Sequence, residues 1–158
     1  MIKVYIAHPL RGENHQKNIE ETAMICRKIY NLFPEIIPIS PIHMFGFLDG
    51  YGLEAESKVI EYCIDTMKMC EKVWLFGDWR KSEGCSIENA VASGCIIPEF
   101  EIPILDFSED ECKVSLGNLK RGSGFANLFD VRKEDPRMEL FMNWLIDSVY
   151  VKNKATKG

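Results

Sequence analysis

Two stretches of the chain combine polar residues with glycine in an order that suits the binding of an anion. The first, 5–12 (YIAHPLRG), ends in Arg11 and Gly12 just before a predicted helix. The free N–H groups at a helix start and the fork of a guanidinium can together hold an anion. On spacing alone, however, an ordinary solvated arginine is the better interpretation of Arg11. His8 follows the first predicted strand and could touch a ligand, although for a single histidine of this kind a structural role is the better interpretation.

The second stretch, 77–88 (GDWRKSEGCSIE), leads from a turn into a short helix. Ser82, Gly84 and Ser86 could offer hydroxyl and backbone N–H groups to a phosphate at the start of that helix. Serines also cap helices, and a glutamate such as Glu88 also suits the helix dipole, so a purely structural interpretation is strong. A carboxylate beside an anion site is harder to explain as structure, because the two repel. It is natural where the carboxylate faces the sugar of a nucleotide whose phosphate the serines hold.

A second carboxylate, Asp65, falls on a predicted helix shortly before an apolar run. It is either a surface residue or the partner of Glu88. Two carboxylates in one cleft would supply a nucleophile and an acid, a base or an orienting group. The sequence holds no G-x-G-x-x-G, no P-loop motif, no Cys-x-x-Cys pair and no zinc spacing. The six cysteines are therefore interpreted as reduced core thiols, with Cys85 the exception because it lies inside the second stretch.

Alternating strands and helices must position these residues. Short β-rich runs predict a first strand at 2–7 and a second at 35–40, in which Pro38 suggests either an edge position or a strand end. A continuously apolar run predicts a central strand at 72–76. A further strand-rich region, interrupted twice by proline, covers 95–107. Apolar residues spaced three and four apart predict helices at 14–33, 53–69, 86–93 and 134–151. We expect a loop at 41–52 and irregular chain at 108–131, with a mobile surface loop at 120–124. A polar tail is expected at 152–158.

This alternation predicts one α/β domain, 1–151, with a Rossmann-like (flavodoxin-like) parallel sheet sandwiched by helices. In such sheets ligands bind beyond the carboxyl ends of the strands, where both stretches lie. The chain has 158 residues, 46% of them apolar, and a net charge of −5. These values fit a single globular domain and disfavour a general DNA or RNA binder. No apolar run approaches the roughly 18 residues of a membrane span, and the N-terminal run is too short for a signal peptide, so we expect a cytoplasmic protein without a membrane partner.

Taken together, the motifs resemble those of the nucleoside 2-deoxyribosyltransferase-like superfamily. The resemblance is to its small nucleotide N-hydrolases, of the 2′-deoxynucleoside 5′-monophosphate N-glycosidase type, and to the uncharacterised domain family DUF4406. It rests on Tyr5 with Arg11 and Gly12 six and seven positions later, on Asp65 standing 23 positions before Glu88, and on the S-x-G-x-x-x-E pattern at 82–88. It covers roughly residues 2–107.

The resemblance implies a role for each matched residue. Glu88 would be the nucleophile that attacks C1′ of the sugar, Asp65 would hold the sugar or help protonate the departing base, and Tyr5 would orient the nucleophile. The transferase branch has Asp at the position of Ser82, and a serine there favours a substrate with a 5′-phosphate. The substrate-binding set implied in this way is Ala7, His8, Arg11, Gly12, Asp78, Trp79, Ser82, Gly84 and Ser86.

The same resemblance sets the expected partners. The substrate would be a small nucleotide, no metal or redox cofactor would be required, and the chain would form a homodimer or a larger homo-oligomer. Base exchange between nucleosides is an alternative within the same reaction class. A non-catalytic module that captures a nucleotide-derived signal of the ADP-ribose type is an alternative from another class, since aromatic residues such as Phe45, Tyr51 and Trp79 leave room for base stacking.

Overall fold

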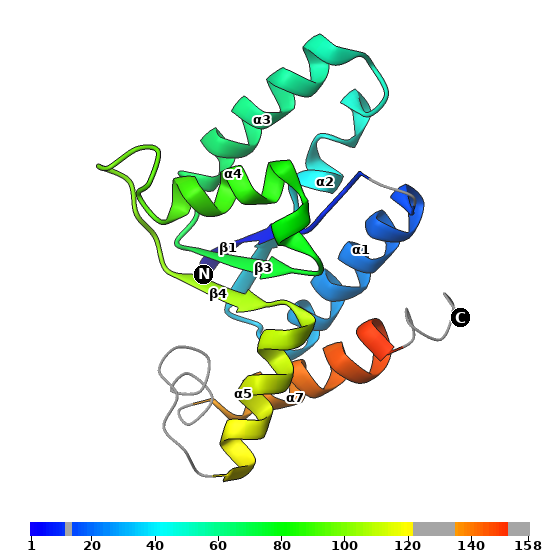
Figure 1. Cartoon of the computed structure of the whole chain (residues 1–158), viewed down its shortest axis with the longest axis vertical. Coiled ribbons are helices and arrows are strands. Elements are labelled where there is room, and N and C mark those ends of the chain that lie inside the picture. Colours follow the sequence, from blue (N-terminus) through cyan, green and yellow to red (C-terminus); the bar gives the residue numbers. More distant parts are fainter. Residues whose placement is uncertain (12–13, 122–134, 152–158) are drawn as a thin grey trace.

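The computed structural model describes residues 1–11, 14–121 and 135–151 (Figure 1). Four parallel strands form one sheet in the order β2-β1-β3-β4. They are β1 (Ile2–Ala7), β2 (Ile36–Ile39), β3 (Lys72–Phe76) and β4 (Ile104–Phe107). The predicted Rossmann-like α/β fold is confirmed, with β2 at an edge and β3 inside the sheet. The proline-interrupted region supplies one strand, β4.

Helices cover both faces of the sheet, and each face has its own core (Figure 1). Because side chains alternate along a strand, Val4 and Ile6 of β1 enter one core while Tyr5 and Ala7 enter the other. The first core is closed by α1 (His15–Leu32), α5 (Glu109–Arg121), α7 (Pro136–Trp144) and the π-helical segment η3 (Leu145–Tyr150). The second is closed by α3 (Leu53–Met67) and α4 (Glu83–Ala92). Tyr5 therefore points to the same side as α4.

Aromatic side chains fill the first core. The ring centroid of Phe141 in α7 lies 5.3 to 6.1 Å from those of five other aromatic rings, which belong to Phe33, Trp74, Phe76, Phe107 and Trp144. Edge-to-face and stacked pairs of this kind add to the gain from burial. The C-terminal helix is therefore joined to the middle of the sheet.

Three predicted loops or boundaries were wrong. The region 41–52 contains α2 (Pro41–Met44), which begins with a proline in its favoured first position, and the 3₁₀ turn η1 (Gly46–Leu48). Helix α4 begins at Glu83, three residues earlier than expected, because Ser82 caps it. Much of the region expected to be irregular is α5, whose first turn is acidic and so favours a helix N-terminus.

The remaining expectations on chain organisation fall partly outside the described residues. The glycine-rich part of the expected surface loop, 122–124, and the tail 152–158 are among these. None of the helices in the described ranges combines the length and the apolarity needed to cross a bilayer.

Candidate active site

Tyr5 lies in the second core with its side chain fully buried. Its hydroxyl makes no hydrogen bond of ordinary geometry within the described part of the chain. Burial first, and then the Glu88 carboxyl and the Cys63 thiol, raise the pKa of Tyr5 well above its usual value. The hydroxyl therefore lies near these two groups without a hydrogen bond of ordinary geometry to either. Long or poorly aligned hydrogen bonds are common in catalytic sites without substrate. A buried hydroxyl without a full partner is costly, so this position is available to a ligand or a moving carboxyl.

Glu88 projects from the second turn of α4 and retains partial exposure to solvent. Burial of its carboxyl raises the pKa of Glu88 from 4.5 to about 7, while the Tyr5 hydroxyl lowers it in part. Desolvation favours the neutral acid, and a donor to the carboxylate favours the charged form. At neutral pH, Glu88 is therefore poised between its two protonation states, as a catalytic carboxyl requires.

Two thiols border this carboxyl. Burial, followed by the charge of Glu88, raises the pKa of Cys63 to about 12, and the same causes raise the pKa of Cys85 still further. Cys85 lies one turn before Glu88 on α4, whereas Cys63 comes from α3 and packs against the core that holds Tyr5. Both thiols are neutral at physiological pH. Glu88 is thus surrounded by uncharged groups, and neither thiol is activated as a nucleophile.

Cys63 was missed as a site residue, and Asp65 took its place in the prediction. A helix turns by about 100° per residue, so residues two apart point to nearly opposite sides. Cys63 faces inward together with Met67, one turn later, whereas Asp65 is exposed. Asp65 is not among the groups that influence Tyr5, Glu88 or Cys63. The structure brings Tyr5 and Glu88 together but does not bring Asp65 to them.

The turn after β3 brings the second stretch to the carboxyl edge of the sheet. Ser82 accepts a hydrogen bond from the Cys85 N–H at 3.3 Å, and the Ser86 hydroxyl donates to the Arg80 carbonyl at 3.4 Å. A side chain on Gly84 would meet nothing within 4 Å. The start of α4 therefore faces open space, with backbone N–H groups that suit an anion.

Three other residues of this turn, Asp78, Trp79 and Arg80, have structural partners. The Trp79 indole is buried, and its N–H donates to Asp106 Oδ1 at 3.1 Å. The Arg80 guanidinium lies over the Trp79 ring at 4.5 Å and pairs with Asp106 at 2.8 Å. Asp78 is exposed and pairs with Lys81 at 3.2 Å. The Trp79 ring is therefore bound to β4 through Asp106, so base stacking on this ring would require the turn to rearrange.

The turn after β1 contains the other predicted binding residues. Ala7 is buried at the strand end, and the His8 ring is buried between the Glu21 carboxylate and the Pro9 carbonyl. This is the arrangement of a structural histidine. Arg11 pairs with Glu56 of α3 at 2.8 Å, yet its side chain is 60% exposed, so it can exchange this partner for another anion. Gly12 lies outside the described residues.

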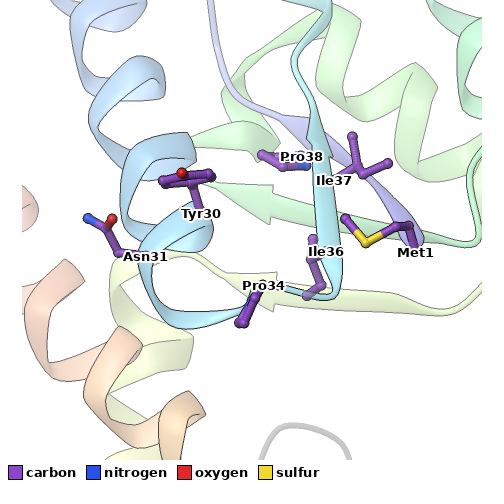
Figure 2. A pocket seen from close by; sticks show the side chains of 7 residues that line it. All are labelled: Met1, Tyr30, Asn31, Pro34, Ile36, Ile37 and Pro38. Atoms are coloured by element: carbon purple, nitrogen blue, oxygen red, sulfur yellow. The ribbon is translucent and has the colours of Figure 1, made fainter.

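Two hollows of the surface lie away from these residues. One of about 430 Å³ opens beside the edge strand β2, where Figure 2 shows its lining of Met1, Tyr30, Asn31, Pro34, Ile36, Ile37 and Pro38. A second is lined by Ser93 and residues 101–104. Neither contains Glu88. Within the described ranges, no group of three histidine, cysteine or acidic side chains is placed to hold a metal ion.

Comparison with known proteins adds a family. A family model described as Domain of unknown function (DUF7768) matches residues 2–99, which is more than half of the chain. This family differs from DUF4406, the domain family that the sequence motifs resemble. Among solved structures, the 2-deoxyribosyltransferase of the psychrotolerant bacterium Bacillus psychrosaccharolyticus is similar over 67% of this chain and 72% of that chain, with 18% identity and a TM-score of 0.46. That enzyme is described as a biocatalyst for the synthesis of nucleosides. No curated protein matches the chain.

Proposed function

Because the chain belongs to the family described as Domain of unknown function (DUF7768), a description that assigns no reaction, we propose a function from the site itself. We propose that the protein is an N-glycosidase that hydrolyses the bond between base and sugar in a (deoxy)nucleoside 5′-monophosphate. Glu88 acts on the sugar, and the start of α4 receives the phosphate.

The observation that carries the proposal is the pairing of Glu88 with Tyr5. A desolvated carboxyl with a pKa of about 7 lies beside a buried hydroxyl that has no ordinary hydrogen bond. Both features destabilise the folded protein, and neither is needed to build the sheet. Such local costs concentrate at functional sites. Glu88 of the pair also lies on α4, the helix that begins at the carboxyl edge of a parallel sheet, which is the usual ligand-binding edge.

The residue types suit glycosidic chemistry in two steps. In the first, an oxygen of ionised Glu88 bonds to C1′, the bond from C1′ to the base nitrogen breaks, and its electron pair leaves with the base, which takes up a proton. In the second, water adds to C1′, the ester to Glu88 breaks, and a proton is released to solvent. The products are free base and sugar phosphate. Because Asp65 is exposed and has no influence on the pKa of Glu88, the proposal assigns it no part in protonating the base.

Three features of the turns after β1 and β3 support a phosphate group on the proposed substrate. The start of α4 is open beside Gly84, Ser82 presents a hydroxyl there, and Arg11 is exposed enough to reach an anion. A carboxylate close to these groups is compatible with phosphate binding when it faces the sugar instead.

We also propose that the protein acts as a homo-oligomer. Three large apolar side chains between η1 and the start of α3 are exposed, Phe47 at 72%, Tyr51 at 79% and Leu53 at 84%. A contact between copies would remove them from water. Light scattering after gel filtration should then give a mass of at least twice 18.1 kDa, and a monomer would disprove this part of the proposal.

A panel of ribo- and deoxyribonucleotides, each incubated with the protein and analysed by chromatography, tests the reaction. Hydrolysis predicts free base and sugar phosphate in equal amounts, and the Glu88→Ala variant should lose at least about 1,000-fold in rate. Glu99→Ala, a change of an exposed glutamate beyond the end of α4, is the matched control and should keep the activity.

The other outcomes separate the alternatives. A new nucleoside formed when a second base is added would indicate base exchange. Tight retention of an intact nucleotide that survives Glu88→Ala would indicate capture without catalysis. If all nucleotides return intact and unbound at high protein concentration, the proposed function is wrong.

A further inference from the structure

The C-terminal segment ends in a buried tyrosine that reaches across the sheet edge. Tyr150 is the last residue of η3 and is 5% exposed. Its hydroxyl accepts a hydrogen bond from the Gly77 N–H at 3.1 Å and donates one to the Phe107 carbonyl at 2.6 Å. One hydroxyl therefore joins the ends of β3 and β4 to the C-terminal helix. Burial and then nearby acidic groups raise the pKa of Tyr150 well above its usual value, so its donor and acceptor roles both persist at physiological pH.

Gly77, the partner of Tyr150, is the first residue of the turn that leads to the candidate site. Its φ of 64° is left-handed, which glycine adopts without strain. A methyl group at this position would come within 3.4 Å of Pro9 Cδ and 3.5 Å of His8 Nε2. Gly77 is thus held between Tyr150 and the turn after β1. The two turns that carry the predicted anion-binding residues therefore lie close together at Gly77.

The turn has a second anchor, which also comes from the C-terminal third. Asp106 of β4 accepts the Trp79 indole N–H and pairs with Arg80. Asp106, Phe107 and Tyr150 all lie beyond residues 2–99, the part of the chain that the family model matches. The residues that could touch a substrate are thus inside the matched part, and those that hold their turn in place are outside it.

The backbone around Tyr150 supports a special role. Helix α7 changes at Leu145 into the π-helical segment η3. Such segments are rare and occur frequently at functional sites, because the wider turn redirects the side chains that follow. Val149, the preceding residue, is 3% exposed and packs in the first core. It offers a matched control, since it stabilises the same segment without contacting the turn through a hydrogen bond.

We propose that Tyr150 is a positioning residue for the candidate active site, because its hydroxyl fixes the turn 77–82 and with it the phosphate end at the start of α4. This inference rests on the proposed function for the identity of the ligand. The positioning itself is a property of the unliganded protein.

Amide exchange and backbone NMR of the full chain test the positioning without any substrate. In Tyr150→Phe, the Gly77 amide should exchange at least 10-fold faster, and the amide signals of residues 78–86 should shift. In Val149→Ala, the melting temperature should fall while these signals and the Gly77 exchange rate stay as in the wild type. Unchanged Gly77 exchange in Tyr150→Phe, or the same changes in Val149→Ala, would overturn the proposal.

Binding measurements then test the consequence. For the mononucleotide of the panel that binds most tightly, Tyr150→Phe should raise the Kd at least 5-fold, whereas the Kd of the parent nucleoside should change less than 2-fold. An equal loss for both ligands would contradict a role at the phosphate end. If the wild type binds neither ligand, the proposed function fails, and the exchange data still decide whether Tyr150 positions the turn.

Discussion

At the level of single residues, Glu88 carries the main cost in folding free energy of the candidate site. Its carboxyl is desolvated among a phenol and two thiols, all uncharged at neutral pH, and the pKa rises to about 7 as a result. The Tyr5 hydroxyl is the group that moderates this rise. A nucleophilic role requires the ionised form, so activity should increase with pH through about 7.

The first prediction concerns the stability cost of this carboxyl. Since folding raises the Glu88 pKa from 4.5 to about 7, the folded protein holds an extra proton between these values, and stability falls as pH rises through that window. Glu88→Gln should therefore stabilise the protein by about 2 to 3 kcal/mol at pH 8 and by much less at pH 5. Urea unfolding at both pH values measures this.

Glu83→Gln is the control for that experiment, because Glu83 is exposed on the same helix. It should give no gain that depends on pH in this way. A gain from Glu88→Gln of equal size at pH 5 and pH 8 would show that Glu88 has an ordinary pKa.

A second prediction distinguishes Cys63 from Asp65. In Cys63→Asp, a new carboxylate beside Glu88 should raise the Glu88 pKa by about one unit or more, since like charges disfavour ionisation. Asp65→Asn should leave the titration of Glu88 unchanged, because Asp65 is exposed on the other side of α3. NMR titration of carbon-13 in the glutamate side chains gives both values. If only Asp65→Asn changes the Glu88 pKa, the placement of Cys63 beside Glu88 and of Asp65 away from it is wrong.

At the level of elements, helix α4 carries both ends of the proposed site. Ser82 caps the helix, the open surface beside Gly84 lies in its first turn, and Glu88 follows in its second. A single ten-residue helix thereby sets the separation between phosphate and sugar groups. Capping and phosphate binding both involve Ser82, and substitution can separate them.

The third prediction uses the fact that aspartate caps helices as well as serine does. Ser82→Asp should change the free energy of unfolding by less than about 0.5 kcal/mol, whereas Ser82→Ala should lower it by about 1 kcal/mol. Ser82→Asp should nevertheless weaken mononucleotide binding at least 10-fold, because its charge repels the phosphate, and should spare nucleoside binding. Urea unfolding and calorimetric titration check the two effects. Equal binding of the mononucleotide by wild type and Ser82→Asp would show that Ser82 takes no part in binding the phosphate.

Most elements were predictable, because their apolar patterns are strong. The run KVWLF predicts β3 within its observed bounds, and the three-and-four spacing predicts α1 within one residue at each end. Helix α5 was missed because its buried apolar side chains are few, with Cys112 and Leu116 one turn apart. Its acidic first turn was the available signal.

The candidate site was predictable in part, for a reason of helix geometry. Motif order alone pointed to Tyr5 and Glu88, which the fold does place together. The choice between Cys63 and Asp65 depends on which side of α3 faces the sheet. The apolar face of α3 includes Cys63, but a cysteine there suggests core packing, whereas a carboxylate suggests chemistry. The sequence pattern thus indicated the face of α3 that lies toward Glu88, while residue type directed attention to a residue on the exposed face.

At the level of the whole molecule, the two faces of the sheet have different tasks. The face covered by α3 and α4 holds Tyr5 and Glu88, and the opposite face holds the aromatic core in which Phe141 is central. The aromatic cluster is thus on one side of the sheet, and the candidate catalytic carboxyl with its buried tyrosine is on the other. This arrangement lets the aromatic core offset the cost of the site.

The fourth prediction tests that arrangement. Phe141→Ala should lower the free energy of unfolding by about 3 to 5 kcal/mol, because it removes a large, fully buried ring and leaves a cavity. Leu140→Ala, its neighbour in sequence with 59% exposure, should change it by less than about 0.5 kcal/mol. Chemical denaturation of both variants gives the comparison. Similar values for the two would mean that α7 does not dock through Phe141.

The anchoring of the turn by Asp106 and Tyr150 has a consequence for the growing polypeptide on the ribosome. All of the residues that could touch a substrate are synthesised before either anchor. An incomplete chain, or a fragment cut ahead of Tyr150, would carry every one of those residues without the bond that holds Gly77 in place. If the proposed function holds, competence to bind a nucleotide is therefore acquired late in translation, and prematurely terminated products are expected to be inert.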